Sequence, residues 1–182
     1  MLKILCSVLV SLGLLSANAN ARPNVKDPEN TLVMKLKDGE VLIEMFPDVA
    51  PEHVKRIKEL VRQGFYDGLK FHRVIDGFMA QTGDPQGTGM GGSGKKLKAE
   101  FNNKAHRRGT VSMARANDPN SADSQFFICF DNATFLDRQY TVWGQVISGM
   151  QYVDKIKRGT GSNGTVHGPD TIISLKVLAD VK

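Results

Sequence analysis

The sequence predicts a mainly β protein, a closed antiparallel β-barrel of roughly seven or eight short strands capped by two α-helices. Three observations predict this fold: repeated stretches in which polar and apolar residues alternate, only two segments with helical spacing, and glycine-rich connections. The chain has 182 residues, 41% of them hydrophobic and 24% charged, which is typical of a single globular domain. The formal net charge of +5 is spread along the chain, so no nucleic-acid partner is implied.

The first 21 residues have the order of a cleaved secretory signal peptide. Lys3 precedes an apolar run over 4–15, and small residues end at Ala21. The run is shorter than the roughly 20 residues that span a membrane, so we expect export and cleavage, with no membrane span in the mature form. Export fits a bacterial periplasm best, and a eukaryotic secretory route is the alternative. We expect a flexible segment over 22–30 and one domain over 31–182.

Cleavage would also remove one of the two cysteines. Cys129 would then be alone, so an exported form could make no internal disulfide. Cys129 lies in an apolar stretch, which predicts a buried, inert thiol rather than a nucleophile.

The elements follow from local periodicity. Apolar residues alternate with charged ones on both sides of Asp38-Gly39, which predicts a β-hairpin over 31–46. Pro51 begins a helix whose apolar residues are three and four apart and which ends near Gly64. Met150 begins a second, short helix that runs to Lys157. The remaining strands are predicted over 71–75, 78–82, 109–113, 125–130, 140–147 and 171–181.

Two possible kinds of site can be set aside. The cluster over 87–96 resembles a phosphate-binding loop, but Lys96 stands where Ser or Thr is needed, and neither a buried strand before it nor a long helix after it is predicted. A flexible surface loop is therefore the better interpretation. The four histidines are far apart and none has metal-ligand spacing to another, so we expect no metal site and no cofactor.

A third pattern suits an extended apolar peptide. The stretch 71–84 places Arg73, Phe78 and Gln81 on neighbouring strands, with Met79 beside the turn. A paired hairpin projects alternate residues to one face, so a cation, an apolar wall and an amide donor can share one groove. On this stretch alone, a structural role is an equally good interpretation: Phe78 and Met79 would be core residues and Arg73 a solvated charge.

The same stretch resembles the cyclophilin family of peptidyl-prolyl cis-trans isomerases. The motif FHRVIDGFMAQTGD at 71–84 is followed in family order by VSMARA at 111–116, SQFFIC at 124–129 and FLD at 135–137. The resemblance covers nearly the whole mature chain and implies an eight-stranded antiparallel barrel closed by two helices, with the active groove on its outer face. It implies an enzyme that rotates X–Pro bonds in polypeptides and assists folding.

The resemblance also implies site residues. Arg73 corresponds to the catalytic arginine, and His72 before it is interpreted as structural support. The substrate-binding residues that it implies are Phe78, Met79, Gln81, Ala114, Arg115, Ala116, Gln125, Phe127, Phe135, Leu136 and Tyr140.

Three positions depart from the most familiar family pattern. Phe135 stands where many members carry Trp, Tyr140 where they carry His, and Arg115 where Asn is common. Loss of an indole donor predicts reduced cyclosporin affinity, whereas proline packing needs only an apolar wall. Arg115 favours acidic residues before the proline. The partners that we expect are proline-containing extended polypeptides bound by a monomer. The alternative function is a non-catalytic proline-peptide binding module or chaperone that uses the same groove.

Overall fold

A computed structural model describes residues 24–181 of the chain, so the predicted signal segment 1–21 lies outside the described residues. None of the helices within 24–181 is long and apolar enough to cross a membrane. The strands are β1 (Thr31–Leu36), β2 (Gly39–Met45), β3 (Arg73–Ile75), β4 (Met79–Thr82), β5 (Thr110–Met113), β6 (Phe126–Cys129), β7 (Val142–Ser148) and β8 (Ser174–Val177). The helices are α1 (Pro51–Arg62) and α2 (Met150–Val153), with short 3-10 helices η1 (Pro28–Asn30), η2 (Thr134–Leu136) and η3 (Leu178–Asp180).

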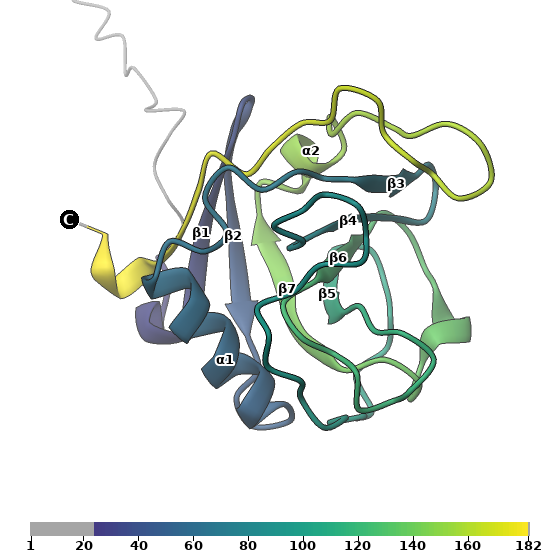
Figure 1. Ribbon diagram of the computed structural model, residues 1–182. Coiled ribbons are helices and arrows are strands. Elements are labelled where there is room, and N and C mark those ends of the chain that lie inside the picture. Colours follow the sequence, from purple (N-terminus) through teal and green to yellow (C-terminus); the bar gives the residue numbers. More distant parts are fainter. Residues whose placement is uncertain (1–23, 182) are drawn as a thin grey trace, which may run out of the picture.

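The eight strands form one antiparallel sheet in the order β3-β4-β6-β5-β7-β2-β1-β8. Figure 1 shows the sheet curling, with α1 along one side and α2 at the upper end. A mainly β fold with eight antiparallel strands and two α-helices is confirmed.

The two edge strands β3 and β8 are not joined by a ladder, so the predicted closure of the barrel stays a prediction. The segments that precede them meet through an isolated bridge between Lys70 and Thr171. Two further backbone bonds, from the Phe71 N–H to Asp170 and from the Ile172 N–H to Leu69, both 2.9 Å long, flank that bridge.

The first hairpin forms as the alternation predicts. Leu36 pairs with Gly39 and Thr31 with Glu44. Gly39 has no side chain, and a Cβ there would lie 2.5 Å from the ring of Tyr152. A side chain at this position would therefore have to displace the Tyr152 ring from its place beside the turn.

Helix α1 begins at Pro51, whose missing N–H costs nothing at the first helical position. The Ala50 side chain cannot cap the helix, and the Glu100 carboxylate takes that role by accepting from the N–H groups of Glu52 (3.1 Å) and His53 (3.0 Å). The apolar face of α1 is fully buried against the main core, at Val54, Ile57, Leu60 and Val61.

Several elements differ from the predicted ranges. Helix α2 ends at Val153, because the next turns are closed by i→i−3 bonds rather than i→i−4 bonds. Strand β8 spans only Ser174–Val177 of the predicted 171–181, because backbone groups of 170–172 bond to residues 68–71 and residues 178–180 turn into η3. Within the segment predicted to be flexible, Pro28–Asn30 forms the helix η1, capped by the Asp27 carboxylate.

Candidate active site

A row of side chains crosses four neighbouring strands on one face of the sheet. Arg73 of β3 is paired with Gln81 of β4, Gln81 with Phe127 of β6, and Phe127 with Ser112 of β5. Directly opposed residues project to the same face, so a cation, an amide and an aromatic ring lie side by side. The register thus brings residues from far apart in the sequence into one site.

This row lies beside a cavity of about 610 Å³. Ten of the predicted site residues line it: Arg73, Phe78, Met79, Gln81, Ala114, Arg115, Phe127, Phe135, Leu136 and Tyr140. The other two, Ala116 and Gln125, line an adjacent cavity of about 300 Å³, which Gln81, Ala114 and Arg115 share. The two cavities together form one groove, and the residues that they share lie at the boundary between them.

The floor of the first cavity is a small apolar cluster that is separate from the main core. Its buried members are Met79, Phe127, Cys129, Ala133 and Leu136. Phe127 is held between two rings, stacked on His106 at 6.1 Å and edge-on to Tyr140 at 6.0 Å. This floor is apolar and borders the open space of the cavity.

Arg73 is one of two arginines that line the first cavity, the other being Arg115. The Nε of Arg73 donates to the Asn163 carbonyl (2.9 Å) and one terminal nitrogen donates to Gln81 Oε1 (3.1 Å). No carboxylate within residues 24–181 forms an ion pair with it. Burial lowers the pKa of the guanidinium, but arginine remains charged at neutral pH. The remaining N–H groups of Arg73 are free to meet a ligand.

The rim of the cavity carries larger and more exposed side chains. Phe135 is 65% exposed and lies tilted against Phe78, with ring centroids 5.4 Å apart. The Arg115 guanidinium lies 4.6 Å above the Tyr140 ring and donates to the Gln139 carbonyl (3.0–3.1 Å). Arg115 therefore faces both cavities from a fixed position.

The polar boundary between the cavities is a chain of side-chain amides. Gln81 Nε2 donates to Gln125 Oε1 (2.9 Å), and Gln125 Nε2 donates to the carbonyls of Gly89 (3.0 Å) and Gly91 (2.8 Å). Arg73, Gln81, Gln125 and the glycine cluster are thus linked end to end.

Two loops contribute residues that the sequence analysis did not select. Asn163 and Thr165, together with Thr88, Gly87 and Gly89, line the first cavity. The carbonyls of Asn163 and Gly89 accept from Arg73 and Gln125, and residue type does not reveal a contact made by the backbone. The one available signal was the glycine cluster itself, which permits close approach of the backbone.

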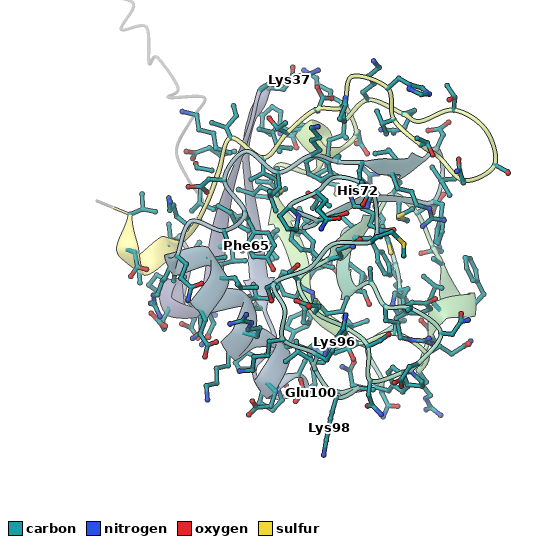
Figure 2. The ribbon with its side chains drawn as sticks, in the orientation of Figure 1. Lys37, Phe65, His72, Lys96, Lys98 and Glu100 are labelled. Carbon is teal, nitrogen blue, oxygen red and sulfur yellow. The ribbon has the colours of Figure 1, made fainter. Side chains whose placement is uncertain are left out.

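The glycine cluster is a surface loop and not a phosphate loop. No helix follows it, and Leu97 instead forms a bridge with Ala122. Two buried carboxylates order it. Asp84 accepts from the N–H groups of Gln86, Thr88 and Gly89 (2.6–2.9 Å), and Asp123 from those of Ser93 and Gly94 (2.7–3.1 Å). Figure 2 labels Lys96, the last residue of this loop, and shows Lys98 pointing away from the body.

Two further titratable groups near the site, His72 and Cys129, are buried. His72 is 8% exposed, and burial lowers its pKa below the ordinary histidine value. Burial raises the pKa of the Cys129 thiol to about 12, which makes it inert. Within residues 24–181 no group of three His, Cys, Asp or Glu side chains could hold a metal ion.

Comparisons with known proteins agree on one family. Residues 31–177 match the family model described as "Cyclophilin type peptidyl-prolyl cis-trans isomerase/CLD". A "Probable peptidyl-prolyl cis-trans isomerase" of Brucella suis is 52% identical over 181 residues, covering 92% of each chain. A "Peptidyl-prolyl cis-trans isomerase" of Helicobacter pylori is 45% identical over 130 residues, covering 69% of this chain and 79% of that one.

Solved structures give the same result. The crystal structure of cyclophilin AquaCyp293 from Hirschia baltica matches with a TM-score of 0.76 at 31% identity, covering 86% of this chain and 76% of that one. A cyclophilin type isomerase of Cryptosporidium parvum, crystallised in the presence of the dipeptide Ala-Pro, matches with a TM-score of 0.75 at 28% identity. That match covers 81% of this chain and 98% of the other.

Proposed function

Because this chain belongs to the cyclophilin-type peptidyl-prolyl cis-trans isomerases and is therefore an isomerase of X–Pro peptide bonds, we propose that Arg73 is the residue that carries its catalysis. The observation that supports this most directly is the row of Arg73, Gln81 and Phe127 beside one cavity. We propose a separate role for each part of that cavity.

Isomerisation of an X–Pro bond requires only a modest rate acceleration, and no covalent bond is made or broken. Uncatalysed rotation about an X–Pro bond takes about 10–100 s because amide resonance raises a barrier near 20 kcal/mol. A typical turnover of about 1–10³ s⁻¹ requires a barrier lower by about 1.4–7 kcal/mol. Since no covalent bond forms or breaks, neither a nucleophile nor a proton relay is needed.

Arg73 suits the changing charge of the reacting amide. As the bond twists, the proline nitrogen becomes pyramidal, and its lone pair, which is delocalised into the carbonyl in the planar ground state, becomes localised on nitrogen. A guanidinium N–H aimed at that nitrogen stabilises the twisted state selectively, by about 2–4 kcal/mol in a site with little water. The bonds to Asn163 and Gln81 use part of the fork and leave other N–H groups for the substrate.

The apolar floor anchors the proline while the preceding carbonyl rotates. Phe78, Met79, Phe127 and Leu136 would contact the ring, and Phe135 and Tyr140 would close the rim. Holding one side of the bond fixed turns binding energy into orientation. The Ala-Pro dipeptide named with the Cryptosporidium parvum structure supports this use of the cavity.

The second cavity and its boundary would bind the residues before proline. Gln81 and Gln125 provide amides, and Ala114, Arg115 and Ala116 form one wall. The Arg115 charge at this wall favours acidic residues in the bound polypeptide.

The alternative is a binding module or chaperone that keeps the groove without catalysing rotation. NMR exchange on an Ala-Pro peptide separates the two, because an enzyme broadens the cis and trans signals and a module only shifts them. We expect broadening with the native chain and about 30- to 1,000-fold slower exchange with Arg73→Ala, the equivalent of about 2–4 kcal/mol. Equal exchange rates in the two proteins, at equal peptide occupancy, would contradict the proposed catalytic role of Arg73.

The setting in which the enzyme works is also proposed. The order of residues 1–21 supports export, with a bacterial periplasm as the compartment and extended client polypeptides as substrates. We further propose a monomer with reduced cyclosporin affinity, whose sheet closes into a barrel at the Lys70–Thr171 bridge. Cell fractionation and the mass of the exported form would test the export and cleavage directly.

A further inference from the structure

The glycine cluster over 87–96 contacts the site, but the proposed catalysis assigns it no role. Its carbonyls at Gly89 and Gly91 are both acceptors for the side-chain amide of Gln125. Three hydrogen bonds then lead from Gln125 through Gln81 and Arg73 to the Asn163 carbonyl, each 2.9–3.1 Å long. The cluster is therefore one end of a continuous polar chain that includes the proposed catalytic group.

This chain has only one favourable direction. The two carbonyls at the glycine end can only accept, so Gln125 must turn its NH₂ group toward them and its oxygen toward Gln81. Gln81 must in turn present its NH₂ group to Gln125 and its oxygen to Arg73, which can only donate. Reversing either amide would place oxygen against oxygen or donor against donor at two contacts.

The loop that provides those carbonyls is held by Asp84. This carboxylate is 1% exposed and accepts from the N–H groups of Gln86 (2.8 Å), Thr88 (2.9 Å) and Gly89 (2.6 Å). Burial by itself would raise the pKa of Asp84, yet the backbone donors together hold it below the ordinary value, so the group is ionised at neutral pH.

The loop also needs glycine at its closest point to this carboxylate. A Cβ on Gly91 would lie 2.0 Å from Asp84 Oδ1, which no packing adjustment of a side-chain tip can relieve because Asp84 is already bonded on several sides. The position of the Gly91 carbonyl is thus coupled to Asp84 by direct contact.

We infer that Asp84 is a positioning residue for the isomerase reaction: through the glycine loop, Gln125 and Gln81 it sets the orientation in which Arg73 meets the substrate. Asp84 lines neither cavity. Its effect on Arg73 passes through the side-chain amides of Gln125 and Gln81. The inference rests on the proposed role of Arg73, since it assigns how that role is prepared.

The central test is a double-mutant cycle. Asp84→Asn keeps the shape but puts an NH₂ group among backbone donors, so the loop carbonyls shift. We expect kcat/KM for an Ala-Pro peptide to fall about 3- to 10-fold, mainly in kcat, as for loss of one ordered hydrogen bond. In a Gln125→Leu background, where the chain is already cut, Asp84→Asn should cost less than about twofold. Equal losses in the two backgrounds would overturn the inference.

A readout independent of activity separates this inference from the proposed catalysis. The Nε–H signal of Arg73 in ¹⁵N-edited NMR reports its hydrogen bond to the Asn163 carbonyl, and so the orientation of the guanidinium whose terminal nitrogen bonds to Gln81. We expect Asp84→Asn to shift or broaden it, and an unchanged signal would contradict the inference even if activity fell. A shifted signal together with a fully active Arg73→Ala variant would support the chain of contacts and overturn the proposed catalyst instead.

Two further variants guard against a folding defect. Asp76→Asn makes the same change at the exposed turn between β3 and β4, where the carboxylate forms an ion pair with Arg158, and should leave kcat/KM within about twofold. Gln125→Glu leaves Asp84 and its backbone donors unchanged, but it replaces the donor to the Gly89 and Gly91 carbonyls with an acceptor and so cuts the chain at that contact. If Asp84→Asn does not fold, Gln125→Glu should still move the Arg73 signal, and an unmoved signal there would overturn the inference.

Discussion

The two faces of strand β6 carry neighbouring phenylalanines, Phe126 and Phe127, which lie in different surroundings. Phe126 points into the main core and is fully buried, with its ring edge-on to Tyr66 and Trp143 at 5.5 Å. Phe127 points to the opposite face, where it forms the floor of the groove beside Met79. Strand β4 divides in the same way, with Ala80 in the core and Gln81 in the groove.

The difference shows how a small sheet can separate stability from function. The core side is closed on every side by large side chains, whereas the cluster under the groove is thin and ends in the exposed ring of Phe135. Removing a core ring leaves a void that nothing fills. Removing a groove ring mainly enlarges a cavity that is already open.

The largest effect is expected from Phe126→Ala. The void among Tyr66, Trp143 and the helix side of the core should lower the free energy of unfolding by about 3–5 kcal/mol. Urea unfolding followed by far-UV circular dichroism measures this loss. A loss below about 1 kcal/mol would show that the core collapses around the void and that the two faces are less distinct than their burial suggests.

Phe127→Ala should have the opposite balance. We expect the free energy of unfolding to fall by only about 2 kcal/mol, because the space opens onto the groove. The isomerase kcat/KM should fall by roughly 10- to 100-fold, since the proline loses its anchoring wall. The same urea titration and a peptide exchange assay measure both quantities. A loss of stability matching that of Phe126→Ala, with full activity, would break the comparison.

A smaller effect concerns pH and two buried histidines, one on each side. His53 bonds to Glu100 beside α1, and His106 bonds to Asp137 behind Phe127. Burial holds the pKa of both below the ordinary value of about 6.5, so the unfolded chain takes up protons first as the pH falls.

The stability that these groups provide is therefore present above about pH 6.5 and declines as the pH falls toward their folded pKa values. Each contributes a slope of at most about 1.4 kcal/mol per pH unit. Urea titrations between pH 7.5 and 5 measure the total slope, and His53→Gln should reduce it. A free energy of unfolding that rises as the pH falls below 6.5 would contradict the assignment.

The smallest effect is expected at the groove rim. Phe135→Trp restores an indole N–H at an exposed position, and we expect cyclosporin to bind about fivefold more tightly, as for one added hydrogen bond. Isothermal titration calorimetry measures the change. Phe135→Tyr, which adds a hydroxyl at a different point of the ring, is the matched control, and equal gains in both variants would exclude a specific indole contact.

Local patterns predicted the elements better than the contacts between them. The hairpin around Gly39 and the helix from Pro51 follow from neighbouring residues, and both form as predicted. The pairing of Gln81 with Phe127 joins strands far apart in the chain, and only the family resemblance brought these residues together. The closing strand was predicted too long, because 170–173 bond to two different segments, which no alternation pattern reveals.

The groove was predicted in its side chains and missed in its backbone. Arg73 and Phe127 have residue types that suggest their chemistry, and both lie at the first cavity. The backbone carbonyls of Asn163, Gly89 and Gly91 are not indicated by any residue type, although they accept hydrogen bonds from Arg73 and Gln125. The glycine cluster predicted a surface loop correctly, but its attachment to Asp84 depends on a tertiary approach that spacing does not encode.

The central claim is that the forked guanidinium of Arg73, rather than positive charge alone, speeds the rotation. Arg73→Lys keeps the charge but cannot bond to Asn163 and Gln81 while also facing the substrate. The most direct measurement is the cis–trans exchange rate of an Ala-Pro peptide at saturation, with its Kd determined in the same NMR titration. We predict a rate at least about 10-fold lower with Kd within about twofold. A lysine variant that exchanges the bound peptide as fast as the native chain would contradict the account.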